Sequence, residues 1–197
     1  MAKHQARTSK DRSDDDGRRT ADNALAVAND SSQHALSEAN GPTTIDVLLP
    51  SDELFMQEAL RDAQRALEMG EVPVGAVVVC DGVILAHGWN RNLTGNDPTA
   101  HAEIVALREA GAIIGNHRLG DCELFATIEP CAMCAGALVH ARIKRLVYGA
   151  ADPTAGAVHS VVQVLNHPQL NHLMEVKGGV LAGQCAEVLQ AFFRAKR

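Results

Sequence analysis

The sequence predicts an α/β fold, a three-layer α/β/α domain built around a mixed five-stranded sheet. Apolar, β-branched runs of strand length alternate along the chain with segments whose apolar residues recur at helical spacing. Two of the strand runs are joined by Asp81-Gly82, a dipeptide that favours a tight antiparallel hairpin. The helical segments after the second and third strands are long enough to act as crossovers, which favour parallel neighbours in the sheet.

Residues 1–50 differ in composition from the rest of the chain. They are rich in Ser, Asp, Arg, Asn and Ala and hold few large apolar residues before Ile45. Such a segment buries too little apolar surface to stay ordered, so we expect a disordered N-terminal extension. The acidic run Asp14–Asp16 argues against an organelle transit peptide. A tail that binds a partner is the alternative, and the folded domain is expected over residues 51–197.

The first helix is expected to begin at Ser51, a favourable N-cap residue, and to run to Gly70. Asp52 and Glu53 lie in its first turn, where the helix dipole favours acidic side chains. The apolar residues that mark its core face at helical spacing are Leu54, Phe55, Ala59, Ala63, Ala66 and Leu67.

The later elements follow from the same patterns. Thr99 is expected to cap a helix that runs to about Ala110. Pro130 ends a strand-like run and suits the start of the next helix. The expected strands are Val74–Cys80, Val83–Trp89, Leu124–Ile128, Ile143–Gly149 and Met174–Leu181, and the other expected helices are Cys131–Ala141, Val161–Leu165 and Ala182–Lys196.

Composition limits the classes of protein to consider. The chain has 197 residues, which suffices for one ordinary globular core. We find no segment that resembles a signal peptide or a membrane span. Five cysteines, an odd number, fit a reducing compartment better than a disulfide framework, so a cytoplasmic protein is expected.

Cys131 and Cys134 stand three residues apart, directly after Pro130. This spacing places both sulfurs on one face of a helical first turn, where the positive dipole end favours thiolates. The pair suits two zinc ligands, and His101 is the best third ligand. The alternatives are small core residues, a structural four-ligand zinc site and a thioredoxin-like redox pair, but no second close cysteine pair exists.

His101 and Glu103 lie two residues apart, so they share no face of a regular helix. They can both reach one group only where the chain enters a helix, so we expect a metal between two helix N-termini. A zinc ion with an open fourth position binds water, and Glu103 is placed to take the proton of that water. The alternative for Glu103 is an ordinary first-turn acid.

Several motifs follow one another in a recognisable order: Val72–Val77, Gly88–Arg91, Asn96–Ile104, Glu129–Gly136 and Phe192–Arg194. In these motifs the chain resembles the zinc-dependent nucleoside and nucleotide deaminases, and among them the bacterial tRNA adenosine deaminases. The resemblance covers about residues 52–197 and implies a cytidine-deaminase-like fold. The zinc signature is common to the superfamily, whereas the flanking motifs narrow the resemblance to the tRNA branch.

The resemblance also implies roles for individual residues. Glu103 would carry a proton from the zinc-activated water to N1 of adenine and then to the leaving ammonia. Asn90 would contact the flipped-out base, helped by free backbone N–H groups at Ala102 and Glu103. From the sequence alone, an ordinary loop asparagine is the alternative for Asn90. Asp152 lies in a loop, residues 149–157, that resembles a segment close to the RNA, although Ala151 stands where many relatives carry a basic residue.

Net charge argues against a broad nucleic-acid surface, because the chain carries a formal charge of −6. RNA would have to bind local basic clusters. The expected clusters are Arg142, Lys144 and Arg145, and Arg194, Lys196 and Arg197. The alternative for each residue is a solvated face or a helix C-terminus that complements the helix dipole. The aromatic residues that could stack on bases, or else belong to the core, are Trp89, Phe192 and Phe193.

The resemblance therefore implies hydrolytic deamination of adenosine to inosine at the wobble position of a tRNA anticodon stem-loop. It implies one Zn²⁺ per subunit, a homodimer and no membrane partner. A zinc deaminase of a free base or nucleoside, of the guanine or cytosine type, is the first alternative. A non-catalytic, zinc-stabilised binding module is the second.

Overall fold

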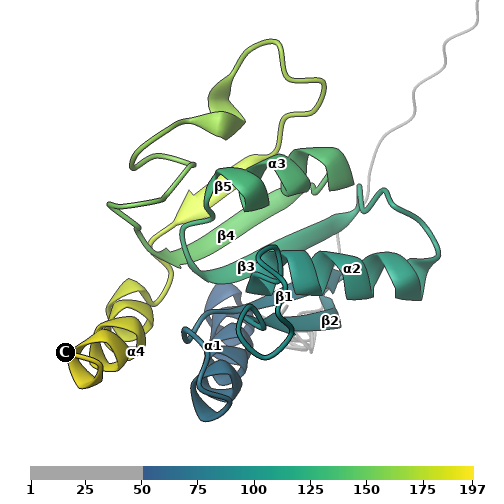
Figure 1. Ribbon diagram of the computed structural model, residues 1–197. Coiled ribbons are helices and arrows are strands. Elements are labelled where there is room, and N and C mark those ends of the chain that lie inside the picture. Colours follow the sequence, from purple (N-terminus) through teal and green to yellow (C-terminus); the bar gives the residue numbers. More distant parts are fainter. Residues whose placement is uncertain (1–50) are drawn as a thin grey trace, which may run out of the picture. The chain divides into compact units, whose positions relative to one another are not determined.

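A mixed sheet of five strands, in the order β2-β1-β3-β4-β5, organises the part of the chain that the structure describes (Figure 1). The computed structural model describes residues 51–197, so the expectation of a disordered extension over residues 1–50 lies outside it. Strand β1 pairs antiparallel with β2 and β3, whereas β3, β4 and β5 run parallel. The strands are β1 (Gly75–Cys80), β2 (Val83–Trp89), β3 (Cys122–Ile128), β4 (Arg145–Ala150) and β5 (Glu175–Gly178).

The hairpin and one of the two expected parallel crossovers are confirmed. Asp81 and Gly82 both have positive φ, 51° and 74°, and Cys80 pairs directly with Val83 across the turn. The crossover after β3 places β4 parallel beside it. The crossover after β2 does not give a parallel neighbour: β3 lies beyond β1 and pairs antiparallel with it, because β1 still offers a free edge to the incoming strand.

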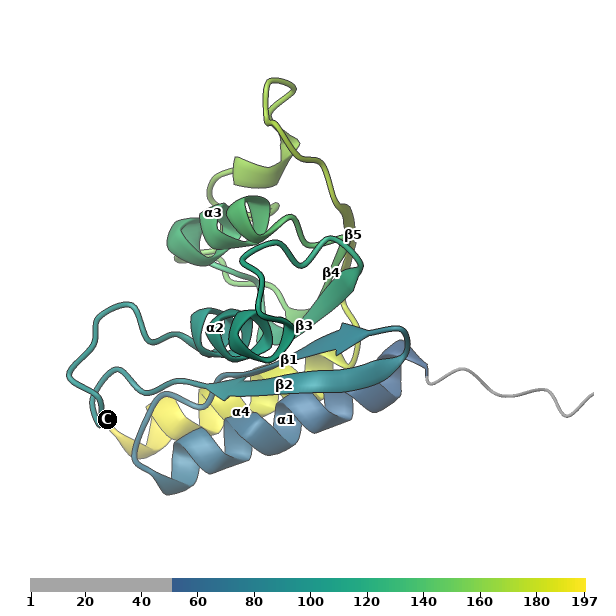
Figure 2. The same ribbon diagram turned by 90° about the vertical axis from the view of Figure 1, so that its right-hand side faces the viewer.

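Two helices cover each face of the sheet. Helices α1 and α4 lie side by side on one face, and α2 and α3 lie on the other (Figures 1 and 2). Among residues 51–197, no helix is both long and apolar enough to cross a membrane. The helices are α1 (Asp52–Glu68), α2 (Ala102–Ile114), α3 (Ala132–Ala141) and α4 (Ala182–Ala195), with a 3₁₀ turn η1 (Val164–Asn166).

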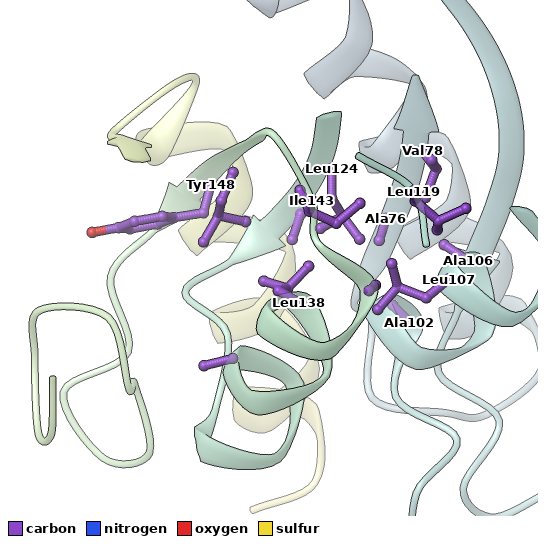
Figure 3. Packing of buried hydrophobic residues seen from close by; sticks show 14 of the residues in the cluster. Ala76, Val78, Ala102, Ala106, Leu107, Leu119, Leu124, Leu138, Ile143 and Tyr148 are labelled. Carbon is purple, nitrogen blue, oxygen red and sulfur yellow. The ribbon is translucent and has the colours of Figure 1, made fainter. Parts of the chain in front are cut away.

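The alternation of side chains along β1 divides the core into two layers. Ala76 and Val78 belong to the cluster that packs under α2 and α3, and Val77 and Val79 belong to the cluster under α1 and α4. Figure 3 shows the first layer, in which Leu138 of α3 faces the sheet. Burial on both faces of the central strands confirms the three-layer α/β/α prediction.

Two expected helix positions were wrong. Helix α2 begins at Ala102 rather than after Thr99, because the backbone N–H and hydroxyl of Thr99 bind Asp97 Oδ1 at 2.8 and 2.6 Å. The expected helix Val161–Leu165 is only the three-residue turn η1. At the start of α1, Ser51 occupies the N-cap position as expected, but its side chain makes no capping hydrogen bond.

The cysteines outside the Cys131-Cys134 pair depart from expectation. Cys80 and Cys122 lie directly opposite each other on β1 and β3, with 4.4 Å between their Cα atoms, so their sulfur atoms are in contact. Because the two cysteines lie 42 positions apart in the sequence, the residue pattern did not predict this pairing. Cys185 is a buried free thiol, and burial raises its pKa to about 11.

Candidate metal centre and active-site cavity

The candidate site lies at one edge of the sheet. Val74 precedes β1, whereas Asn90, Glu129 and Asp152 follow β2, β3 and β4. Because β1 runs antiparallel to its neighbours, its N-terminal end meets the carboxyl ends of β2, β3 and β4 at the same edge. All four residues line one cavity of about 390 Å³, together with His101, Glu103 and Cys131.

The three predicted metal ligands converge on one point beside this cavity. His101 Nδ1 lies 3.6 Å from Cys131 Sγ and 3.5 Å from Cys134 Sγ, and the two sulfurs are 3.7 Å apart. Tetrahedral zinc with bonds of about 2.3 Å to sulfur and about 2.0–2.1 Å to nitrogen requires separations of about 3.8 and 3.6 Å. The donor set and its spacing therefore fit zinc with three protein ligands.

The local structure confirms the expected approach of two helix N-termini. His101 is the N-cap residue of α2, and Cys131 is the N-cap residue of α3. Cys134 follows within the first turn of α3 and is fully buried. Contact with the Cys134 thiol and the His101 ring lowers the pKa of Cys131 to about 4, so a thiolate is present at neutral pH.

Glu103 lies in the first turn of α2 and lines the cavity, although only 2% of it is exposed. Burial raises the pKa of its carboxyl group above the usual value. A carboxyl group in this position, next to the metal ligands, can accept a proton and later donate it.

Asn90 and Ala102 are brought together, but not in the expected way. The Ala102 N–H donates to Asn90 Oδ1 at 2.9 Å, so this backbone group is not free for a base. The hydrogen bond also fixes the orientation of the Asn90 amide, because only its oxygen can accept. The amide NH₂ remains as the group that Asn90, 7% exposed, can offer to a ligand in the cavity.

Asp152 and Arg194 occupy different parts of the site. Asp152 lines the zinc cavity, but its Oδ1 accepts hydrogen bonds from the Thr154 and Ala155 N–H groups and the Thr154 hydroxyl. Arg194 lies outside this cavity and lines a second one of about 620 Å³, together with Ala151 and Arg197. The two cavities adjoin, since they share Ile128, Asp152, Thr154, Leu189 and Phe193 as walls.

Arg145 contradicts the expected basic cluster. Its guanidinium group, 17% exposed, forms ion pairs with Asp52 at 2.7 Å, Glu123 at 2.8 Å and Glu175 at 3.1 Å. These carboxylates occupy its donors, so Arg145 is a structural residue and not a phosphate contact. The sequence shows three basic residues within four positions, but it does not show which of their side chains points towards the domain and which towards solvent.

The three aromatic candidates differ in their access to the site. Phe192 is 8% exposed and belongs to the core, whereas Phe193 is 48% exposed and lines both cavities. Trp89 lines neither cavity and stacks instead under the Arg91 guanidinium group, 4.0 Å from the ring centroid. Only Phe193 of the three is placed to touch a ligand.

Sequence reasoning missed Glu71 and Glu129, which are 1% exposed and line the cavity. Burial alone would raise the pKa of Glu129, but N–H donors from His159, Ser160 and Asp152 lower it to about 2. The available signal was the position of each acid, directly beside an apolar strand run, where an unpartnered carboxylate would be unfavourable.

Comparisons with known proteins agree with this geometry. Residues 49–150 match the model of the family described as the cytidine and deoxycytidylate deaminase zinc-binding region. The tRNA-specific adenosine deaminase of Haemophilus influenzae is 48% identical over 74% of this chain and 85% of its own length. That of Bacillus subtilis is 43% identical over 76% of this chain and 92% of its own length.

Solved structures show the same fold. A structure from work on A-to-I editing by tRNA:A34 deaminases has a TM-score of 0.67 and 47% identity, over 68% of this chain and 98% of its own. The guanine deaminase of Nitrosomonas europaea has a TM-score of 0.63 and 26% identity, over 73% of this chain and 85% of its own. The chain thus belongs to the zinc-binding cytidine and deoxycytidylate deaminase family, and within it to the group of the tRNA-specific adenosine deaminases.

Proposed function

We propose that this chain hydrolyses adenosine to inosine at the wobble position of a tRNA anticodon, with one Zn²⁺ held by His101, Cys131 and Cys134. The observation that carries the proposal is the convergence of these ligands beside Glu103, on a cavity of about 390 Å³. Ligand pockets commonly measure about 300–1,000 Å³, so the cavity suits one flipped-out nucleotide. The tRNA-specific relatives support the choice of substrate.

The reaction requires two proton transfers, and Glu103 is placed to carry both. Zinc, when bound, supplies a Lewis acid that lowers the pKa of a water molecule. Glu103 takes the proton of that water and passes it to N1 of adenine while the oxygen adds to C6. Glu103 then takes the second proton of the water from the oxygen that is now bound to C6 and gives it to the amino group, so that ammonia leaves and the C6 oxygen of inosine remains.

Asn90 provides the directional contact to the base. Because its oxygen accepts from the Ala102 N–H, its NH₂ group can only donate, and a purine ring nitrogen can accept. Guanine also presents such a nitrogen, and N3 and O2 of cytosine accept hydrogen bonds as well, so this contact orients a base but does not by itself separate adenine from guanine or cytosine. The choice between adenosine in RNA and free guanine therefore rests on contacts outside the base pocket.

Those outer contacts lie along α4 and the second cavity. Arg194 and Arg197 line it beside Ala151, so the end of α4 supplies positive charge to this cavity. Phe193 stands between the two cavities and offers an exposed ring to a neighbouring base. We assign phosphate contact to Arg194 and Arg197, and no such role to Arg145.

The deciding experiment measures initial rates on several substrates. These are an anticodon stem-loop with adenine at the wobble position, the same loop as DNA, free adenosine, free guanine and cytidine. We expect the RNA loop to react faster than free adenosine, guanine and cytidine, since a loop can reach both cavities and a free base or nucleoside cannot. Faster turnover of guanine or cytidine would support a free-base or nucleoside deaminase instead, and zinc binding without turnover of any substrate would support a binding module.

Salt dependence separates phosphate contacts from base contacts. For single-stranded nucleic acid, log affinity falls against log salt with a slope of about 0.7 per phosphate contact. Arg194→Ala should weaken RNA binding and lower this slope by about one contact. Arg118→Ala is the matched control, because Arg118 is exposed and lines neither cavity.

We further propose that the chain forms a homodimer in the cytoplasm, where its tRNA substrate is found. An apolar hollow of about 700 Å³ between α2 and α3 is lined by Ile104, Leu107 and Ala137. Ile113 and Ile114, at the end of α2, are 55% and 43% exposed. Sedimentation of the wild-type protein and of Ile113→Glu tests the proposal: the charge should shift a dimer towards monomer, and a monomeric wild-type protein contradicts it.

A further inference from the structure

We propose that Glu71 and Glu129 are positioning residues, each of which holds one of the two loops that form walls of the zinc cavity. The inference rests on the proposed function, since it concerns the shape of the same cavity. Both residues are 1% exposed, and all the hydrogen bonds that their carboxylates accept in the described part of the chain come from loop residues. Neither residue has a part in the proton transfers assigned to Glu103.

Glu129 fastens the loop of residues 152–160 at both ends. At the far end, its Oε1 accepts the N–H groups of Val158, His159 and Ser160 at 3.0, 2.7 and 2.9 Å. Its Oε2 accepts the Asp152 N–H at 3.1 Å and the Ser160 hydroxyl. Five donors thus surround a single carboxylate, and the loop between them supplies Asp152, Thr154 and Ala155 to the cavity wall.

The same loop is tied directly to the turn that carries the metal ligands. The Ala157 N–H donates to the Pro130 carbonyl at 2.8 Å, and Gly156 forms an isolated β-bridge with Cys131. The loop approaches so closely that a Cβ atom at Gly156 would lie 2.5 Å from the Glu129 carboxyl carbon. The position of this wall is therefore set by Glu129 relative to the metal ligand two residues later.

Glu71 holds the other loop, residues 91–97, in the same way. It follows α1, and its own N–H donates to the Ala66 carbonyl at 2.9 Å, which fixes its backbone. Its carboxylate accepts the Leu93 N–H at 3.1 Å, the Thr94 N–H at 2.7 Å and the Thr94 hydroxyl at 2.9 Å. This loop directly follows Asn90 and supplies Asn92 and Leu93 to the cavity.

A carboxylate suits this task because it only accepts hydrogen bonds and bonds strongly to N–H groups. Neither loop contains a helix or strand between residues 91 and 97 or between 151 and 160, so the buried charges replace regular hydrogen bonding. A cavity whose walls occupy the binding arrangement only part of the time binds its substrate more weakly by that fraction. Holding two cavity walls therefore matters for substrate binding as well as for loop order.

The test uses Glu71→Gln and Glu129→Gln. Each amide keeps the shape of the side chain but replaces one accepting oxygen with an NH₂ donor that faces loop N–H groups. We expect full zinc content, a KM for the RNA loop raised about 10-fold or more, and a smaller change in kcat. Hydrogen exchange should quicken at residues 93–94 only in Glu71→Gln and at residues 158–160 only in Glu129→Gln.

Glu109→Gln is the control, because Glu109 is exposed on α2 and outside the zinc cavity. Should Glu129→Gln fail to fold, Ser160→Ala removes a single donor to the same carboxylate and should quicken exchange in the same loop. Unchanged KM and unchanged loop exchange would overturn the inference, as would faster exchange throughout the domain. If wild-type protein turns over no substrate, the proposed function fails, while loop-specific exchange still tests whether the two carboxylates hold the loops.

Discussion

His101 Nδ1 and Cys134 Sγ lie 3.5 Å apart, although 33 positions separate the two residues in the sequence. His101 is the N-cap residue of α2 and Cys134 lies in the first turn of α3, so a metal between them ties α2 to α3. We expect His101→Ala and Cys131→Ser to lose zinc and to unfold at lower temperature, because metal binding contributes to folding. Zinc content by atomic absorption and the thermal midpoint measure both effects.

The control for this prediction is Cys185→Ser, which changes a buried thiol outside the site. This variant should keep its zinc. Full zinc occupancy in both purified ligand variants would show that the ligand set is wrong.

Glu103→Gln should separate zinc binding from turnover. The amide fills the same buried position but cannot carry a proton, so zinc and fold should be kept. General acid–base catalysis contributes about 10²–10⁴-fold, and we expect kcat to fall by at least that factor. Single-turnover rates on the RNA loop measure the loss, and a rate near that of the wild type would remove Glu103 from the reaction.

The sequence alone predicted the features that depend on residues close together in the chain. The Asp81-Gly82 hairpin depends on two adjacent residues with positive φ, and the zinc cluster on donor types near two helix starts. The predicted start of α2, by contrast, was wrong. Thr99 donates hydrogen bonds to Asp97 in a separate turn before the helix begins. Local competition between two capping arrangements is not visible in a residue pattern.

The other features that the sequence did not predict depend on contacts between residues far apart in the chain. The donors to Glu129 come from residues 23 to 31 positions later, and Asp52 lies 93 positions from Arg145. No periodicity marks such pairs, and an isolated acid in the sequence resembles any solvated one. The same reason explains why Arg145 was expected in a basic cluster and Cys80 was not expected to pair with Cys122.

Asn90 variants should distinguish its two hydrogen-bonding roles. In Asn90→Ala the buried Ala102 N–H loses its acceptor, which destabilises the fold by about 1–3 kcal/mol. In Asn90→Asp the acceptor is kept but the NH₂ donor is lost. We therefore expect both variants to lose activity on the RNA loop, and only Asn90→Ala to lose stability in urea. An active Asn90→Asp enzyme would contradict donation to the base.

The variant Arg145→Ala tests whether the ion pairs of Arg145 with Asp52 and Glu123 are structural. Removing the guanidinium group leaves Glu123 without this partner and Asp52 with Lys177 alone, and hydrogen bonds to charged groups contribute about 1.5–3 kcal/mol. We expect Arg145→Ala to lower the free energy of unfolding by about that amount. RNA affinity and its salt slope should stay unchanged, in contrast to Arg194→Ala. A reduced salt slope in Arg145→Ala would return this residue to the RNA contacts.

The ion pair between Asp52 and Arg145 also predicts how the stability of the domain depends on pH. Hydrogen bonding to Arg145, opposed by burial and aided by Lys177, lowers the pKa of Asp52 to about 2 from an ordinary value of 3.8. Because the folded state binds this proton less readily than the unfolded chain, the pair stabilises the fold fully above about pH 4 and loses this effect as pH falls towards 2. Asp52→Asn should therefore be less stable than the wild type at pH 7, with the difference shrinking at pH 3. Urea unfolding of both proteins at the two pH values measures the change, and a difference that stays constant would show that the Asp52 charge does not stabilise the domain.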